Sequence, residues 1–315
     1  MREGQGRLYG ALRKLYGQFQ SYLDTDTDVE IAPVALGFSV TFRHDMDRFD
    51  ANTFDDFLRL EEQIDAPSTL FFLQSQYTDF PERIGSLDRD KFELALHSEA
   101  KATPICWSLF QLSRLAERGY ARRLQHQHRR FARELGASQG HAAHSVNNYL
   151  PFQGWINWNI IENASLRAGF AYVSDWRLPS RVAEGEEFMQ PWPAYLRRRG
   201  AHTILVLPTC WDDKYFFYSY EDHYIRRTAP DTVPYRPRGT DEAWHSFLRQ
   251  AESCRTLNTP CVLNIHPWHA ASNGQPQFYD LKRRIIDWCV EQDVPIRQCR
   301  EYPMICAHRD ESGDR

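Results

Sequence analysis

The chain has 315 residues, of which 42% are hydrophobic and 25% charged, and a formal net charge of −4. This composition is that of a globular protein with one large domain or two ordinary ones, and the negative charge argues against nucleic acid as the main partner. We expect no signal peptide and no membrane span, because no stretch approaches the ~20 apolar residues that a spanning helix needs. Seven cysteines without a CxxC pair indicate reduced thiols, which predicts a cytoplasmic protein.

Residues 8–23 place leucine and aromatic side chains at helical spacing, which predicts an N-terminal amphipathic helix followed by a linker to residue 30. An apolar run at residues 31–38 indicates a buried strand, and the first strand of the main domain is predicted at about residues 35–42. Further strands are predicted at residues 68–73, 92–97, 140–145, 171–176, 203–207, 261–265 and 294–298.

Helices are predicted between these strands, at residues 51–64, 109–135, 155–168, 241–254 and 277–289. Residues 211–237 are aromatic and polar without a clear period, which predicts a long loop over a site. Residues 308–315 are polar and are predicted to be a disordered tail, so that the main domain covers residues 31–307.

Strands alternate with helices along the whole chain, a pattern that predicts a parallel sheet in an α/β fold. Seven or eight such units favour a closed (β/α) barrel over an open sheet, and active sites of such barrels lie at the carboxyl ends of the strands. Six polar residues fall at or just after predicted strand ends: Asp45, Asp47, His97, His144, Asp175 and His266.

The sequence RHDMD at residues 43–47 follows the first predicted strand. Because side chains alternate along a strand, Arg43, Asp45 and Asp47 would share one face, with adjacent side chains roughly 6–7 Å apart. At that spacing one carboxylate can hold a metal ion while the other reaches a water molecule on it. Arg43 can also form a charge-assisted hydrogen bond with Asp45, which would keep that carboxylate ionised.

Five segments, in order, resemble the motifs of the polysaccharide deacetylase superfamily (the NodB-homology domain of carbohydrate esterase family 4). They are FRHDMD at 42–47, STLFF at 68–72, ELALHS at 93–98, GFAYVSD at 169–175 and LNIHP at 263–267. The first has the RHDxD form found in a variant subgroup. The resemblance runs from about residue 35 to residue 267 and implies a distorted TIM barrel of seven or eight parallel strands.

The resemblance also implies roles for single residues. Asp45 matches the catalytic base, Asp47 and His97 match metal ligands, and His266 matches the general acid that protonates the leaving amine. The implied reaction is hydrolysis of an N-acetyl or related acyl group on a carbohydrate or glycan precursor. The implied cofactor is a divalent metal, with Zn²⁺ first and Mn²⁺, Co²⁺ or Fe²⁺ as alternatives.

The chain departs from the family pattern at the third metal ligand, where Lys101 stands in place of a histidine. Three outcomes stay open. Another group could complete the site, with His144 as first candidate and Glu99 as second. The metal could bind weakly through Asp47 and His97 alone. Lys101 could instead replace the charge of the metal, because an ammonium group is no ligand and repels a cation; the protein would then bind a glycan or a partner through the same cleft without catalysis.

Substrate contacts are predicted for Arg43, His44, Asp175, Trp176 and Trp268. The tryptophans near strand ends, Trp211 among them, could stack on a sugar ring or pack in the core. His141 is expected to be structural, because it falls on the opposite strand face from His144.

Overall fold

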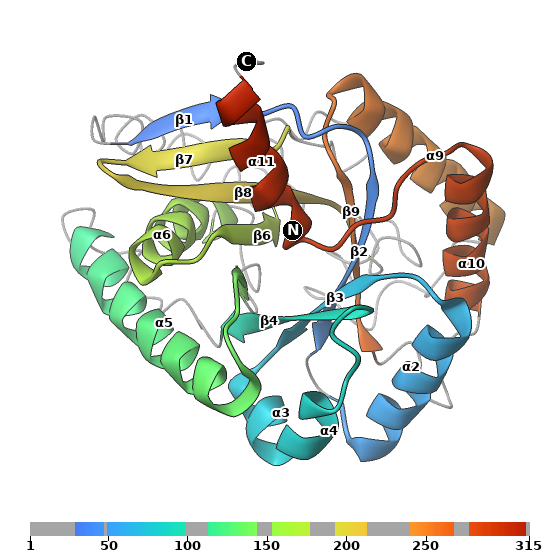
Figure 1. Ribbon diagram of the computed structural model, residues 1–315, viewed down its shortest axis with the longest axis horizontal. Helices are drawn as coiled ribbons and strands as arrows, with labels where there is room; N and C mark the ends of the chain where they lie inside the picture. The colour runs from blue at the N-terminus through green and yellow to red at the C-terminus, as the bar shows by residue number, and fades with distance from the viewer. Residues whose placement is uncertain are drawn as a thin grey trace, which may run out of the picture.

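The computed structural model describes residues 29–46, 49–98, 113–143, 153–176, 193–212, 240–267 and 277–312. Seven parallel strands form a closed barrel, which confirms the predicted α/β barrel fold (Figure 1). They are β2 (Val40–Met46), β3 (Ser68–Phe72), β4 (Phe92–Ser98), β5 (Gly140–Ala143), β6 (Tyr172–Trp176), β8 (His202–Asp212) and β9 (Cys261–Ile265). Their order is β2-β3-β4-β5-β6-β8-β9, and the pairing of β9 with β2 closes the ring.

Helices surround the barrel: α2 (Ala51–Ile64), α3 (Gln74–Asp79), α4 (Pro81–Gly85), α5 (Ser113–Leu135), α6 (Gln153–Ala168), α9 (Thr240–Thr256) and α10 (Gln277–Glu291). The short helices α3 and α4 were not expected from the sequence. Helix α2 shows why a helix forms where the sequence predicts one. The Asp50 side chain accepts a hydrogen bond from the Thr53 backbone N–H at 2.8 Å, and Phe54 and Phe57 bury the inner face.

The core has two layers, because the barrel strands are buried on both faces. Side chains such as Phe42, Leu70 and Leu263 point outward and pack under the helices. Side chains such as Phe71 and Tyr172 form a second cluster with residues of other strands that are not neighbours in the barrel, so this cluster fills the interior. Alternation along β2 therefore decides which residues face the interior and which face the helices.

Two further strands extend the barrel sheet through antiparallel pairs, so the sheet is not parallel throughout. Strand β7 (Tyr195–Arg199) pairs with β8, and β1 (Glu30–Pro33) pairs with β7 at the edge. The prediction of one buried strand at residues 31–38 is therefore wrong. Ile31 is 50% exposed, and the extended conformation is interrupted before β2 at Gly37, whose φ is +84°. Strand β7 was missed because three of its five residues are arginines.

The C-terminal part also differs from the prediction. The strand expected at residues 294–298 is a single bridge between Val40 and Ile296. Residues 308–312 of the expected disordered tail instead belong to α11 (Glu301–Ser312), which lies in front of the barrel in Figure 1. Its Tyr302 hydroxyl hydrogen-bonds to Ser39 Oγ at 2.9 Å and Thr41 Oγ1 at 2.6 Å, so α11 covers the amino end of the barrel.

Several expected features lie outside the described residues. They are the helix at residues 8–23, most of the loop at 211–237 and the end of the tail. Within the described ranges, no helix is both long enough and apolar enough to cross a membrane.

Candidate active site

Asp45 lies near the carboxyl end of β2 with its side chain 14% exposed. One carboxylate oxygen accepts a short hydrogen bond from the Arg43 guanidinium, as the sequence predicts. The other accepts a hydrogen bond from the side-chain amide of Asn264 at 3.1 Å. Both oxygens are thus held in place, and the carboxylate keeps its orientation at the mouth of the barrel.

Arg43 reaches across the barrel interior. Its guanidinium donates to the Ser174 carbonyl at 2.6 Å and to the Ser174 and Thr209 hydroxyls, each at 3.1 Å. It also lies 4.7 Å from the centre of the Phe71 ring. Because these contacts come from strands other than β2, Arg43 ties three sides of the barrel to Asp45. The predicted orienting bond is present; a direct contact of Arg43 with substrate stays a prediction.

The electrostatic surroundings keep Asp45 ionised. Burial raises the pKa of Asp45, but the positive charge of Arg43, with smaller contributions from His97 and His266, outweighs burial and lowers the pKa of this carboxyl well below its usual range. Asp45 is therefore a carboxylate at neutral pH, the form that can accept a proton.

Two predicted histidines lie at the same end of the barrel as Asp45. His97 is near the end of β4 and His266 follows β9 directly; their exposures are 1% and 3%. His97 Nδ1 lies 3.1 Å from the Ala142 carbonyl, which can only accept, so Nδ1 carries the proton. In the neutral ring, Nε2 is then the nitrogen that carries the lone pair, and metal-binding histidines are commonly held in this way.

The described residues do not include all of the predicted site. Asp47, Lys101, His144 and Trp268, together with Glu99, lie outside the described residues. Asp175 and Trp176 are the last two residues of β6, so their backbone lies at the same end of the barrel as Asp45; their side chains are outside the description. The third metal ligand, the role of Lys101 and the stacking of tryptophans on a sugar stay predictions.

His44 is not part of this site, and its predicted contact with substrate is wrong. Alternation along β2 turns its side chain outward, where it is fully buried. Its Nε2 lies 3.6 Å from Glu61 Oε1 and 3.4 Å from Lys282 Nζ, and its ring packs against Phe57 at 4.9 Å between centroids. His44 therefore belongs to the layer between the barrel and the helices.

Two other residues are structural. His141 lies between the hydroxyls of Ser98 and Ser165, each at 2.8 Å, which confirms the expected structural role. Burial is the main cause that lowers the pKa of His141 well below its usual value, and the electrostatic effect of the neighbouring His97 is the next. Trp211 is 3% exposed and packs in the outer core, so it does not stack on a ligand.

Two polar residues of the interior were not predicted. Asn264, which holds Asp45, pairs in register with Arg43 and precedes His266 by two residues, so the same-face rule applied to β9 would have found it. Glu93 accepts hydrogen bonds from the Tyr172 hydroxyl at 2.6 Å and the Thr69 hydroxyl at 2.9 Å. Burial outweighs these bonds and raises the pKa of Glu93.

A set of three thiols lies elsewhere in the fold. Cys210, Cys254 and Cys261 have their sulfur atoms within 4.8 Å of one another and are buried between the barrel and α9. Among the described residues, this is the one set of three histidine, cysteine or acidic side chains close enough to share an ion. It lies in the outer layer, whereas Asp45 faces the interior, so it is not the predicted centre.

Comparison with solved structures identifies the fold. A protein from Mycobacterium smegmatis that is assigned as a polysaccharide deacetylase superposes with a TM-score of 0.56, at 18% identity, over 88% of this chain and 94% of that chain. Peptidoglycan deacetylase PdaC from Bacillus subtilis gives a TM-score of 0.43 at 14% identity, over 90% and 95% of the two chains. A CE4 family pseudoenzyme from Bacillus anthracis gives 0.42 at 8% identity, over 84% and 66%.

The similarity to the Mycobacterium smegmatis protein shows that this chain has a polysaccharide deacetylase fold. No protein-family profile matches the sequence. No curated protein matches it either.

Proposed function

We propose that the protein is a metal-dependent hydrolase that removes an N-acetyl or related acyl group from a carbohydrate or glycan precursor. The observation that carries the proposal is the ionised Asp45, held by Arg43 and Asn264 and facing His97 and His266 at the mouth of a deacetylase-type barrel. The motif order in the sequence supports the same assignment. A cytoplasmic location, expected from the cysteine content, is part of this proposal.

The residues of the chain have distinct tasks in this proposal. Asp45 takes a proton from the attacking water, which its low pKa allows because the carboxylate is already ionised at neutral pH. His266 gives a proton to the nitrogen that leaves, because an amine is a poor leaving group unless it is protonated. Arg43 and Asn264 keep Asp45 in one orientation during both steps.

The described part of the site suits a metal. His97 Nδ1 is hydrogen-bonded to the Ala142 carbonyl, the arrangement in which a histidine binds a metal through Nε2. Asp47 and His97 would hold the ion, with His144 as the first candidate for the third ligand, and Zn²⁺ is the ion that such a set favours. When bound, a divalent cation lowers the pKa of water and polarises the substrate carbonyl.

A second candidate function rests on Lys101. If this ammonium group replaces the charge of the metal, the cleft binds a glycan or a partner without hydrolysis. The two functions differ in whether a metal is present.

The deciding experiment measures metal content by mass spectrometry and acetate release from acetylated sugars, on protein purified without a histidine tag. We expect about one equivalent of metal in the wild type, loss of metal and activity in Asp47→Ala, and retained metal without activity in Asp45→Asn. The control is Asp56→Ala, which removes a carboxylate from the outer surface of α2. Absence of metal and of acetate release in the wild type would contradict the hydrolase and support the binding function.

A further inference from the structure

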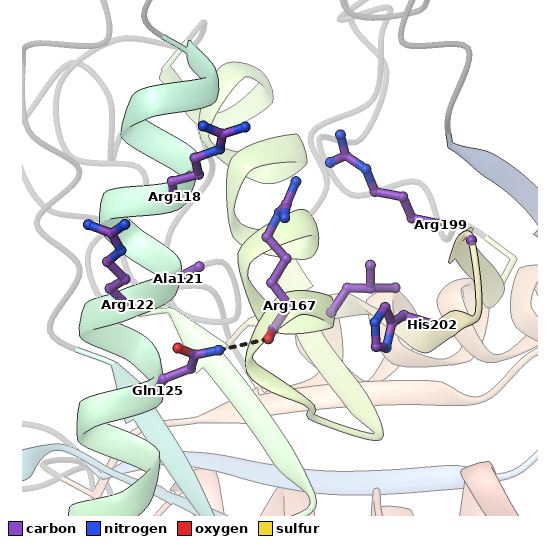
Figure 2. A pocket seen from close by; sticks show the side chains of 9 residues that line it. Arg118, Ala121, Arg122, Gln125, Arg167, Arg199 and His202 are labelled. Carbon is purple, nitrogen blue, oxygen red and sulfur yellow. Dashed lines mark hydrogen bonds between the residues drawn. The ribbon is translucent and has the colours of Figure 1, made fainter.

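A cavity of about 700 Å³ opens on the outside of the barrel, where α5 and α6 face the turn between β7 and β8 (Figure 2). Its described lining is rich in arginine and contains no phenylalanine, tyrosine or tryptophan: Arg118, Ala121, Arg122, Gln125, Leu166, Arg167, Arg199, Gly200 and His202. In Figure 2, the guanidinium groups of Arg118, Arg167 and Arg199 point from three different elements toward the same part of the cavity.

The cavity carries an excess of positive charge. Four arginines line it. Among the described residues, Glu117 supplies the carboxylate that forms ion pairs with two of them. Glu117 Oε1 accepts from Arg167 Nε at 2.5 Å and from an Arg199 terminal nitrogen at 3.2 Å. Arg118 and Arg122 have exposed side chains and no ion pair with any described residue. Among the described residues, four guanidinium groups thus lie near one carboxylate, so positive charge predominates in this part of the cavity.

The ion pairs of Glu117 also hold two of the arginines in place. Its side chain is 7% exposed and fixes Arg167 and Arg199 side by side. Bringing like charges together costs Coulomb energy, which an anion between them would offset. Guanidinium groups suit phosphate in particular, because their planar donors bind two oxygens at once. Since four arginines dominate the described lining, the ligand would be recognised mainly by its negative charge.

This cavity is separate from the candidate active site. Arg167 lies near the end of α6, shortly before β6 begins, and His202 is the first residue of β8. Both are therefore near the amino ends of parallel strands, on the outside of the barrel. Asp45 lies near the carboxyl end of β2 and faces the interior.

We propose that the cavity between α5, α6 and the β7–β8 turn binds the phosphate groups of a phosphorylated ligand. Its volume lies within the range of sites for small molecules, about 300–1,000 Å³. The proposal does not depend on the proposed hydrolase function.

The test is calorimetric titration of the full chain with inorganic pyrophosphate at low salt. We expect binding that weakens as salt is added, and that is at least tenfold weaker in the double variant Arg118→Ala/Arg122→Ala. The matched control is Arg123→Ala/Arg129→Ala, which removes two exposed charges from the same helix α5 at positions outside the cavity lining. No binding by the wild type, or equal loss in both double variants, would overturn the proposal.

A further arm separates this cavity from the proposed metal centre, because pyrophosphate also binds metals. Asp47→Ala should bind pyrophosphate as the wild type does. Loss of binding in Asp47→Ala, with binding retained in Arg118→Ala/Arg122→Ala, would place the phosphate at the metal centre and refute the proposal.

Vesicles distinguish the source of the phosphate. Sedimentation with phosphatidic acid vesicles but not with phosphatidylcholine vesicles, lost in Arg118→Ala/Arg122→Ala, would assign the phosphate to a lipid headgroup. Pyrophosphate binding without vesicle binding would assign it to a free small molecule; both results support the cavity as the site.

Discussion

Lys282 of α10 forms a fully buried ion pair with Glu61 of α2, at 2.6 Å from each carboxylate oxygen. The Lys282 ammonium also lies 4.6 Å from the centre of the Phe42 ring, on the outer face of the barrel. The pair thus joins two helices to the strand that carries Asp45. Replacing Lys282 by Met keeps the volume of the side chain but leaves the Glu61 charge without its main partner.

The expected loss in the free energy of unfolding follows from this geometry. Removing one partner of a buried ion pair costs about 3–5 kcal/mol, because the remaining charge stays desolvated. Glu61 would keep the Ser68 hydroxyl at 3.2 Å and the His44 ring nitrogen at 3.6 Å. Because these partners still stabilise the carboxylate, we expect Lys282→Met to lower the free energy of unfolding by about 3 kcal/mol, the lower end of this range.

The assay is equilibrium unfolding in urea at pH 7, with Glu61→Gln/Lys282→Met as the control variant. The double variant buries no charge at this position, and we expect it to regain most of the loss, to within about 1 kcal/mol of the wild type. A loss below about 1 kcal/mol in Lys282→Met, or a double variant no more stable than the single one, would refute the reasoning.

The pH dependence gives a second check on the same pair. Burial raises the pKa of Glu61, but in the wild type Lys282, with His44 next, outweighs burial and lowers it below its usual range. The wild-type pair therefore keeps its contribution down to the pKa of the unfolded chain, about 4.3. Without Lys282, burial dominates and Glu61 takes up a proton on folding. The deficit of Lys282→Met should therefore shrink between pH 7 and pH 5, and a constant deficit would contradict this explanation.

Three further predictions concern the barrel. A Cβ on Gly140 would meet the Tyr172 ring at 1.9 Å, so Gly140→Ala should lower the free energy of unfolding by at least about 2 kcal/mol in urea. The control Gly119→Ala, in open space on α5, should instead raise it by about 0.5–1 kcal/mol. Burial lowers the pKa of His141 and keeps it neutral in the folded protein, so the unfolded chain binds the extra proton and the free energy of unfolding should decrease below about pH 6.5. His141→Gln should reduce the decrease of the urea midpoint between pH 7 and pH 5. An equal decrease in the wild type and the variant would contradict this prediction. Arg43→Lys keeps the charge but cannot span the partners of the guanidinium, so we expect a loss of about 1.5–3 kcal/mol by thermal unfolding; a neutral effect would contradict this view of Arg43.

The barrel class could be predicted from the sequence because alternating strands and helices leave few ways to connect a parallel sheet. Parallel strands also bring their carboxyl ends to one edge, which is why Asp45, His97 and His266 could be assigned to one site from their places at strand ends. The hydrogen bond between Arg43 and Asp45 was predictable too, since two residues that are two apart on a strand share a face.

The tertiary structure decided the contacts that join distant parts of the chain. Asn264 reaches Asp45 only because β9 pairs with β2 in one register and closes the ring. His44 belongs to the same motif as the site residues, yet its side chain contacts the buried Glu61 and Lys282 on the outer face of the barrel. These pairings depend on register, closure and helix docking, which arise from packing across the whole barrel and leave no local pattern in the sequence.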